Sequence, residues 1–564
     1  MSPKAESATG SWLLAHPLLL AVLAAAVSVG LQGFAFGINN NVFHIPIVLG
    51  YGQLGQFAGD PFIQSLGRFV SPVYLALGLV ADERNIQGLF LACHVLTRVL
   101  TFLALILIVT ASGVRGGWRL LLAVAALVLA RGLYGVSPMG EGGMLPDYFT
   151  HSELSGAFAL LTVAALLRGR LVLAAGLAGI AFALNAFIGV WMLVPVGLGL
   201  LAPWAGWDGP RPQPRPWLRQ LLLAALAFSV PALPVAVWVL RSTAGDAAVA
   251  PFDYREYLYF YFGKHFFMQA SSTREILQSG TAVLAGLAAL LVLPNWRRAL
   301  LPLAGLLLVL GAGAVAGIFA NSRFILNLHL IRADSLLIML SGAYVAAATA
   351  RLAQPAWNWR GIAALLSLAG LLSGLWALSA VALANAWLAG ARAAAPGAPA
   401  GRAIPALCLA LLAAAAILNG AALRKELAAD AIPREADLEG MMPRAPEWLE
   451  MQLWARQNTP AEARFLVPSW PSGFRIGAQR SVWVDFKQGA TAMWAPDTYA
   501  GWRQRVDEIN RLRSLPERCA YARTRGLDYV IIDLRPGRAP ALEGSPAVPL
   551  HANRLFRAYA AASC

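Results

Sequence analysis

Charged residues are scarce in this chain of 564 residues, since Asp, Glu, Lys and Arg make up 13% of it and hydrophobic residues 58%. A soluble protein carries about 25% charged residues. Apolar runs of about 20 residues recur from Trp12 to about residue 420, and each is long enough to cross a bilayer. The composition of the whole chain excludes an ordinary soluble protein and predicts an α-helical polytopic membrane protein.

Cysteine is also rare, and no Cys/His spacing is typical of a zinc site. Cys93 and Cys408 lie in apolar runs, where a thiol packs as a small hydrophobic group. Cys519 and Cys564 lie in the polar C-terminal part and can form a disulfide if that part faces an oxidising compartment. The first run, 12–34, is longer than a typical signal-peptide core and no clear cleavage site follows it, so we expect an uncleaved transmembrane helix.

Acidic residues are fewer than basic ones, 29 against 44, which gives a net charge of +15. In a soluble domain this excess would suggest nucleic acid. Here the arginines fall mostly in short loops between apolar runs, where the positive-inside rule accounts for them. We therefore expect a lipid bilayer and no nucleic acid as a partner.

The apolar runs predict about eleven to thirteen transmembrane helices. They stand at 12–34, 88–110, 117–134, 154–168, 170–184, 187–203, 218–240, 278–294, 299–318, 324–350, 361–389 and 402–420. The stretch 66–80 is shorter and fits a re-entrant or interfacial segment.

Arginine marks every second loop as cytoplasmic, in four groups: Arg115 and Arg119; Arg168 and Arg170; Arg211, Arg215 and Arg219; and Arg297 and Arg298. The loops 35–87, 134–154 and 241–277 then lie outside, with the N-terminus inside. The last of these loops carries an aromatic run, 257–262, which suits a helix anchored at the level of the lipid headgroups.

A soluble α/β domain is predicted at 432–564, after a transmembrane domain at 1–431. Helices are expected at 446–458, 502–512 and 516–525, the last closed by Gly526. Strands are expected at 463–467, 481–486 and 529–532. Twelve spans would leave this domain in the cytoplasm, whereas eleven or thirteen would place it outside, and hydropathy leaves both open.

Asp60 is the first candidate for chemistry. It follows a loop of apolar and polar residues, 36–46, that includes His44, and it is the only acidic residue between the first span and Asp82. A carboxylate there can act as a general base or bind a divalent cation that neutralises a phosphate leaving group. The alternative is a turn, because Gly-Asp-Pro suits an Asx-type turn.

The second outside loop offers Glu141, Asp147 and His151. Glu141 and Asp147 could join Asp60 around a cation such as Mg²⁺ or Mn²⁺. Alternatively, Gly140-Glu141-Gly142-Gly143 is a flexible turn, and His151 with Glu153 caps the next helix.

Ionisable residues inside spans are costly in lipid and usually face a cavity or a partner. Arg98 shares a helix face with His94, four residues before it. Arg323 and Arg332 stand at the start of the run near 324–350. A guanidinium at this position can bind a lipid phosphate. The alternative is an ion pair between helices, but Arg332 and Asp334 are two residues apart and do not face each other.

Together these features resemble the GT-C superfamily of polytopic glycosyltransferases. The resemblance rests on the inside N-terminus, the acidic first outside loop near Asp60 and the C-terminal α/β domain. Within that domain, the segments 458–468, 473–475, 480–485 and 526–533 are similar to the outside domain of oligosaccharyltransferase-like bacterial membrane proteins.

The resemblance implies transfer of a sugar from a polyprenyl-phosphate carrier to an acceptor outside the bacterial cytoplasmic membrane, and a C-terminal domain outside. Asp60 would be the catalytic carboxylate. Arg332, Arg323, His44, His151 and Arg98 would be the candidates for contact with the lipid phosphate. Two features depart from the family, because Asp60 stands alone in its loop and no Trp-Trp-Asp signature is present. A non-catalytic scaffold of the same fold and a lipid or solute transporter are the alternatives.

Overall fold

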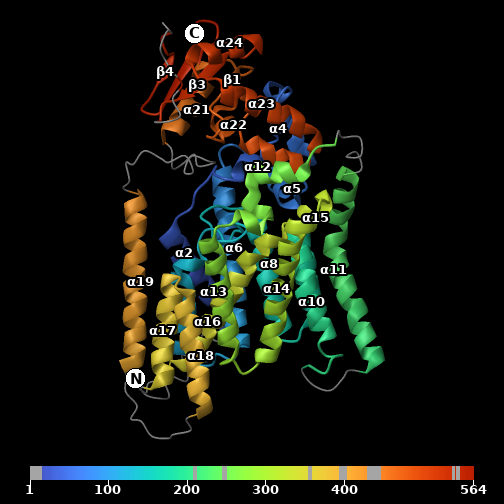
Figure 1. Ribbon diagram of the computed structural model, residues 1–564, viewed down its shortest axis with the longest axis vertical. Helices are drawn as coiled ribbons and strands as arrows, with labels where there is room; N and C mark the ends of the chain where they lie inside the picture. The colour runs from blue at the N-terminus through green and yellow to red at the C-terminus, as the bar shows by residue number, and fades with distance from the viewer. Residues whose placement is uncertain are drawn as a thin grey trace.

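The chain forms two stacked parts, a helical bundle and a smaller C-terminal domain on one end of it (Figure 1). The computed structural model describes residues 15–207, 213–243, 251–353, 358–392, 403–427, 446–535, 540 and 547–564. The predicted boundary between 431 and 432 lies outside the described residues. On either side of it, α19 (Ala403–Leu427) belongs to the bundle and α21 (Pro446–Asn458) to the C-terminal domain.

The bundle is built from helices that run along its length. In chain order they are α2 (Pro17–Gln32), α6 (Ile86–Ala111), α7 (Gly117–Leu129), α8 (His151–Leu167), α9 (Leu171–Leu184), α10 (Ala186–Leu201), α11 (Pro214–Thr243), α13 (Thr273–Leu290), α14 (Trp296–Phe319), α16 (Asp334–Leu352), α17 (Trp359–Ser373), α18 (Trp376–Arg392) and α19. Within the described ranges, five helical stretches are long and apolar enough to cross a membrane, and shorter apolar helices accompany them. The prediction of a mostly helical protein with membrane-length helices and a small C-terminal domain is confirmed at this level.

Short elements connect the long helices. They are α3 (Asn41–Val48), η1 (Tyr51–Gln53), η2 (Gly55–Phe57), α4 (Pro61–Ser65), η3 (Leu66–Arg68), α5 (Pro72–Gly78), η4 (Arg131–Leu133), α12 (Tyr254–Phe266), η6 (Met268–Ala270), α15 (Arg323–Leu326) and η7 (Leu330–Ala333). The stretch 66–80 folds into η3 and α5, which are too short to cross a bilayer.

α16 is the central helix of the bundle, because nearly every one of its residues is buried. A helix that is apolar or small on all sides is one enclosed by others. α11 and α19 lie at opposite edges in Figure 1 and expose large apolar side chains, including Leu226 at 59% and Leu409 at 65%. Contiguous apolar surface of this kind suits contact with lipid.

The run 361–389, expected as one span, is two helices. α17 ends at Ser373, and α18 packs back against it after Gly374. Gly374 has a φ of 76°, a left-handed conformation that ends the helix and favours glycine. Ser379 Oγ then donates to the Ser367 carbonyl across the hairpin. The single apolar run therefore corresponds to two antiparallel helices among the described residues.

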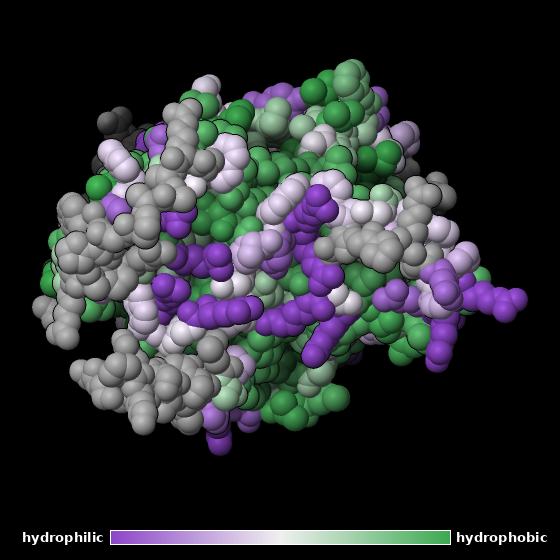
Figure 2. Space-filling model, turned by 90° about the horizontal axis from the view of Figure 1, so that it is seen from below, coloured by the Kyte–Doolittle hydropathy of each residue, from purple (hydrophilic) through white to green (hydrophobic). Residues whose placement is uncertain are grey.

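Arginine-bearing loops gather at the end of the bundle away from the C-terminal domain. Arg351 donates to the Gly113 carbonyl, and Asn295 donates to the Ala111 carbonyl. Viewed from this end, elongated hydrophilic side chains cross the face between hydrophobic flanks (Figure 2). The sorting of positive charge read from the sequence therefore corresponds to one physical end of the molecule.

The C-terminal domain contains a five-stranded sheet in the order β2-β1-β3-β5-β4. Its strands are β1 (Arg464–Leu466), β2 (Ser481–Val482), β3 (Tyr529–Asp533), β4 (His551–Ala552) and β5 (Phe556–Ala560). The β1–β2 and β1–β3 pairs are parallel, whereas β5 is antiparallel to both β3 and β4. The other elements are α21, α22 (Phe474–Ala478), η8 (Lys487–Met493), η9 (Pro496–Thr498), α23 (Tyr499–Arg511) and α24 (Leu515–Thr524).

Most predicted elements of this domain are present. α21 has the expected bounds, and Gly526 follows α24 with a φ of 64°. The strand expected at 481–486 stops at Val482, because the chain turns where Asp485 accepts a hydrogen bond from the Gln488 N–H. Cys519 and Cys564 form a disulfide, which confirms that pairing.

Candidate functional site

Asp60 lies in the first connecting segment under the C-terminal domain, but it does not face a pocket. Its Oδ1 accepts hydrogen bonds from the N–H groups of Phe62 at 3.1 Å and Ile63 at 3.4 Å, so it caps α4 as the turn interpretation predicted. Its Oδ2 lies 2.6 Å from Arg475 Nε and also accepts from the Val482 N–H. Both oxygens are bonded to protein donors in a side chain that is 0% exposed. A catalytic carboxylate is expected to have an oxygen open to a ligand, whereas both oxygens of Asp60 accept hydrogen bonds from the protein.

Arg475 holds two carboxylates at once. Its Nη1 lies 2.6 Å from Asp485 Oδ2, and its guanidinium carbon lies 4.6 Å from the centre of the Phe62 ring. Burial alone would lower the pKa of Arg475, but the charges of Asp60 and Asp485 outweigh it and raise that pKa. A buried guanidinium needs such partners. The cluster therefore ties the first connecting segment to the C-terminal domain.

Further contacts dock the C-terminal domain on the bundle. They include Arg68 with Asp497 at 2.6 Å, Arg456 with Glu83 at 2.7 Å, Tyr257 Oη with the Gly489 carbonyl at 2.8 Å, Tyr261 Oη with the Lys487 carbonyl at 2.9 Å and Arg323 Nη2 with the Met493 carbonyl at 2.9 Å. The aromatic run in α12, expected as a headgroup anchor, thus supplies two of these contacts to the domain. Arg323, expected at a lipid phosphate, takes part in the same docking.

The proposed metal ligands do not gather around a common point. Asp60 is bonded to Arg475, and the Glu141 carboxylate lies 3.9 Å from Lys264 and 3.4 Å from His265. Burial lowers the pKa of His265, so this imidazole is neutral and Lys264 is the charged partner. In the part of the chain that the structure describes, no three His, Cys, Asp or Glu side chains are placed to hold a metal ion. The residues present do not fit the expected cation.

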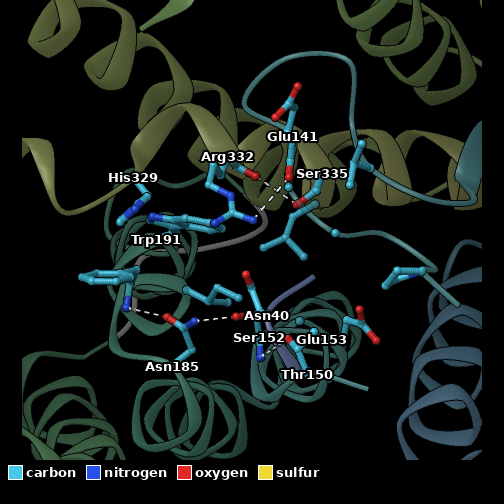
Figure 3. Close-up of a pocket in the computed structure, with 18 of the residues that line it drawn as sticks. Asn40, Glu141, Thr150, Ser152, Glu153, Asn185, Trp191, His329, Arg332 and Ser335 are labelled. Carbon is cyan, nitrogen blue, oxygen red and sulfur yellow. Dashed lines mark hydrogen bonds between the residues drawn. The ribbon is translucent and has the colours of Figure 1, made fainter. Parts of the chain in front are cut away.

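A pocket lies at the end of the bundle that carries the C-terminal domain, with about 690 Å³ of empty space that is partly open to solvent (Figure 3). The N-terminal ends of α8 and α10, η7 and the loop 136–148 form its walls. Its polar lining includes Asn40, Glu141, Glu153, Asn185, Arg332 and Ser335. Its apolar lining includes Phe187, Ile188, Trp191 and Leu336. Of the predicted site residues, the pocket brings together Glu141 and Arg332.

Arg332 presents a guanidinium to this pocket. Its Nη2 donates to the backbone carbonyl of Glu141 at 3.3 Å, while the Glu141 carboxylate points away from it (Figure 3). Asp334 does not pair with Arg332, since its Oδ2 accepts from Ser279 Oγ at 2.7 Å and from the Met139 N–H at 3.1 Å. Within the described residues, Arg332 has no carboxylate at ion-pair distance. The geometry leaves this guanidinium able to bind an anion.

The glycine-rich loop positions Arg332. A Cβ added at Gly140 would lie 2.7 Å from the Ile331 carbonyl oxygen, and one at Gly142 would lie 2.7 Å from the Arg332 carbonyl oxygen. Gly140 also has a φ of 70°. The loop therefore packs against the backbone of η7 more closely than any other residue type allows. It is a positioning element rather than a flexible turn.

Arg98 lies outside the pocket and bonds to the loop that forms one of its walls. It is 2% exposed, and its Nη2 donates to Gln32 Oε1 and to the Pro146 carbonyl. These bonds join α2 and α6 to the loop 136–148. Arg98 does not line the pocket, so its observed contacts are structural.

His44 and His151 meet at Tyr74 instead of at the pocket. The Tyr74 hydroxyl lies 2.9 Å from His44 Nδ1 and 3.2 Å from His151 Nδ1, and it accepts from the His151 N–H. The His44 ring stacks on Tyr74 with centroids 4.1 Å apart. Burial, followed by the charges of His151 and Lys487, lowers the pKa of His44. The residue that caps α8 is Thr150, whose Oγ1 accepts from the Ser152 N–H, rather than His151 with Glu153 as the sequence suggested.

Sequence reasoning missed the residues that complete the pocket. Trp191, Asn185 and His329 line it, and Trp191 Nε1 donates to the Leu328 carbonyl. Asn185 caps α10 and donates to Ser152 Oγ (Figure 3). In the sequence, Asn185 is a polar residue between two apolar runs, and this could have marked it as a candidate. No pattern near Asn185 in the sequence, however, indicates that it lies close to η7.

Comparisons with known proteins reach one part of the chain. Residues 446–509 match a family model described as a domain of unknown function, DUF6798. No curated protein matches the chain. The matched stretch contains Arg456, Arg475 and Asp497, which dock the C-terminal domain on the bundle, and Asp485, which pairs with Arg475.

Proposed function

We propose that this chain is a membrane glycosyltransferase of the GT-C type that takes a sugar from a polyprenyl-phosphate carrier. The supporting observation is Arg332, a guanidinium in a pocket of the bundle with no carboxylate partner among the described residues. An uncompensated guanidinium is costly in a membrane protein and marks a binding site for an anion. A phosphate on a lipid carrier supplies that anion.

The other residues that line the pocket suit the sugar and the prenyl chain of such a carrier. The amides of Asn40 and Asn185 can hydrogen-bond sugar hydroxyls, and Trp191 offers an aromatic face. Phe187 and Ile188 at the start of α10 add apolar surface for a prenyl chain. We therefore assign the phosphate to Arg332 and the sugar to the Asn185 side of the pocket.

The proposed orientation puts the pocket and the C-terminal domain outside the bacterial cytoplasmic membrane. Arginine-rich loops lie at the opposite end of the bundle, which suits a cytoplasmic face. The Cys519–Cys564 disulfide suits an oxidising compartment. Counting α17 and α18 as two passes instead of one gives the odd total that an inside N-terminus and an outside C-terminal domain require.

Binding of radiolabelled undecaprenyl phosphate to the purified protein in detergent tests the proposal. Arg332→Ala should weaken binding by about 10- to 100-fold, because a hydrogen bond to a charged group contributes about 1.5–3 kcal/mol. Arg332→Lys should lose less, since it keeps the charge without the planar fork. Arg351→Ala, at the opposite end of the bundle, is the matched control. Equal binding by wild type and Arg332→Ala would contradict the proposal.

A non-catalytic scaffold is the second candidate, and the Asp60 geometry favours it. The carboxylate expected to carry the chemistry is committed to Arg475. A scaffold would dock partners through the C-terminal domain and would have no need to bind the carrier. Absence of undecaprenyl phosphate binding by a folded wild-type protein would therefore favour this candidate.

A further inference from the structure

Glu153 is a buried carboxylate with no assigned partner. It stands in the first turn of α8, is 9% exposed and lines the pocket. Across the described part of the chain, neither of its carboxylate oxygens has a hydrogen bond or an ion pair. Thr150 already caps α8, so the helix does not need the Glu153 carboxylate for that purpose. An ionisable side chain in such a place is a functional-site candidate.

Its neighbours leave the carboxylate open to the pocket. Arg98 is close enough for its charge to act on Glu153, but the two form no ion pair and Arg98 bonds to Gln32 and the Pro146 carbonyl instead. A Cβ added at Gly143 would lie 3.7 Å from Glu153 Oε1, so the glycine leaves room beside this oxygen. Glu153 and Arg332 line the same pocket from different elements, α8 and η7, and the Glu153 carboxylate is not turned toward Arg332 (Figure 3).

From this geometry we infer that Glu153 is the catalytic base of the pocket, the role that sequence reasoning gave to Asp60. The inference rests on the proposed function and adds a residue to it. With the donor phosphate at Arg332, an acceptor hydroxyl enters beside Glu153. An acid–base carboxylate must reach the proton that it takes, and Glu153 is the pocket-lining carboxylate that has no other partner.

The step balances without a further reactant. The acceptor oxygen forms a bond to the anomeric carbon, and its proton moves to a Glu153 oxygen. The bond between the anomeric carbon and the phosphate oxygen breaks, and the electron pair leaves with the polyprenyl phosphate, whose charge Arg332 holds. Glu153 then returns its proton to solvent through the open side of the pocket.

Two measurements on the full-length protein in detergent test the inference. The first is labelling by dicyclohexylcarbodiimide at mildly acidic pH, where a carboxyl group that serves as a base at higher pH holds its proton and reacts with the reagent. Peptide mass spectrometry locates the label. We expect label at Glu153 and none at Asp60, which is held by Arg475. Undecaprenyl phosphate should protect Glu153 in the wild type and fail to protect it in Arg332→Ala.

The second measurement is release of sugar from undecaprenyl-phosphate glucose, with water or glycerol as the acceptor. Glu153→Gln keeps the side-chain shape and should bind undecaprenyl phosphate within about threefold of wild type. Its rate of release should fall by about 10²–10⁴. Asp82→Asn, an exposed acidic position, is the control for loss of a carboxylate.

The outcomes separate the inference from the proposed function. If the wild type binds no undecaprenyl phosphate, the proposed function fails and the inference fails with it. If the wild type binds the carrier but Glu153 is neither labelled nor protected, the inference alone is overturned. It is also overturned if Glu153→Gln releases glucose as fast as wild type, or if a carrier-binding wild type releases none.

Discussion

At the scale of single residues, two carboxylates have surroundings that differ from those the sequence suggested. Asp60 looked exposed and reactive, whereas Glu153 looked like a helix-capping residue. In the folded chain Asp60 is enclosed by Arg475 and its own helix, and Glu153 faces the pocket. The residue that is chemically available is therefore the one with fewer partners.

Asp60→Asn is predicted to reduce stability rather than to remove a catalytic group. It takes one of two carboxylates from the buried Arg475, and breaking such a pair costs about 3–5 kcal/mol. Thermal unfolding in detergent, followed by tryptophan fluorescence, should show a lower midpoint than in Asp82→Asn. Unchanged unfolding together with lost sugar release would instead support the catalytic role read from the sequence.

His44 is predicted to make stability depend on pH. Burial holds the pKa of folded His44 well below the unfolded value of 6.5, so the unfolded chain binds the proton more tightly. The stabilisation is therefore complete above about pH 6.5 and is lost as the pH falls below it. The melting midpoint should drop between about pH 7 and pH 5.

His44→Phe keeps a ring that can stack on Tyr74 and removes the titrating group. The substitution should make the melting midpoint depend less strongly on pH. Part of the dependence should remain, because His151 still lies beside Tyr74. His551→Phe, in the outer strand β4, is the comparison variant for replacing a histidine by phenylalanine elsewhere in the chain. If the melting midpoint fell equally steeply with decreasing pH in the wild type and in His44→Phe, the prediction would be contradicted.

At the scale of elements, short irregular segments position the pocket. η7 carries Arg332, and the loop around Gly140 and Gly142 packs against its backbone. Both segments lie between long helices that hydropathy identifies well. The functional geometry thus depends on the parts of the chain that apolar periodicity does not describe.

Gly142→Ala is predicted to weaken carrier binding without abolishing folding. The new Cβ would lie 2.7 Å from the Arg332 carbonyl oxygen and 2.8 Å from Ser335 Oγ, so η7 must shift. We expect a loss of about tenfold in undecaprenyl phosphate affinity, or about 1.4 kcal/mol. Gly88→Ala, where a Cβ meets nothing within 4 Å, is the matched control. Wild-type affinity in Gly142→Ala would show that the loop does not set the position of Arg332.

At the scale of the whole molecule, the C-terminal domain is fastened to the bundle by charged, polar and aromatic contacts. The stretch that matches DUF6798, 446–509, provides the docking side, while the disulfide closes the part that follows it. This arrangement predicts one compartment for the pocket and the domain.

Thiol labelling of the protein in cells should report that compartment. If the domain lies outside, denaturation without reductant should expose Cys93 and Cys408 to a maleimide, and reduction should add Cys519 and Cys564. Removing the cross-link, which joins positions 45 residues apart, should cost about 4 kcal/mol of domain stability in the chain-entropy view. Labelling of all four cysteines without reductant would place the domain in a reducing compartment.

The sequence by itself determined those structural features that depend on short local patterns of residues. Runs of apolar residues gave the membrane-length helices, Gly-Asp-Pro gave the capped turn at Asp60, and Gly526 gave the end of α24. Each depends on residues within a few positions of one another. Periodicity missed the α17–α18 hairpin, because a single glycine at 374 interrupts a run that stays apolar on both sides.

Only the tertiary structure decided which charges are paired. Asp60 and Arg475 are 415 residues apart, and the arginine neutralises a carboxylate that appears free in its own loop. Arg332 and Glu153 come from different segments, and only the folded chain brings η7 and α8 together to line one pocket. Charge pairing depends on distance in space, which the order of residues along a chain of this length does not specify.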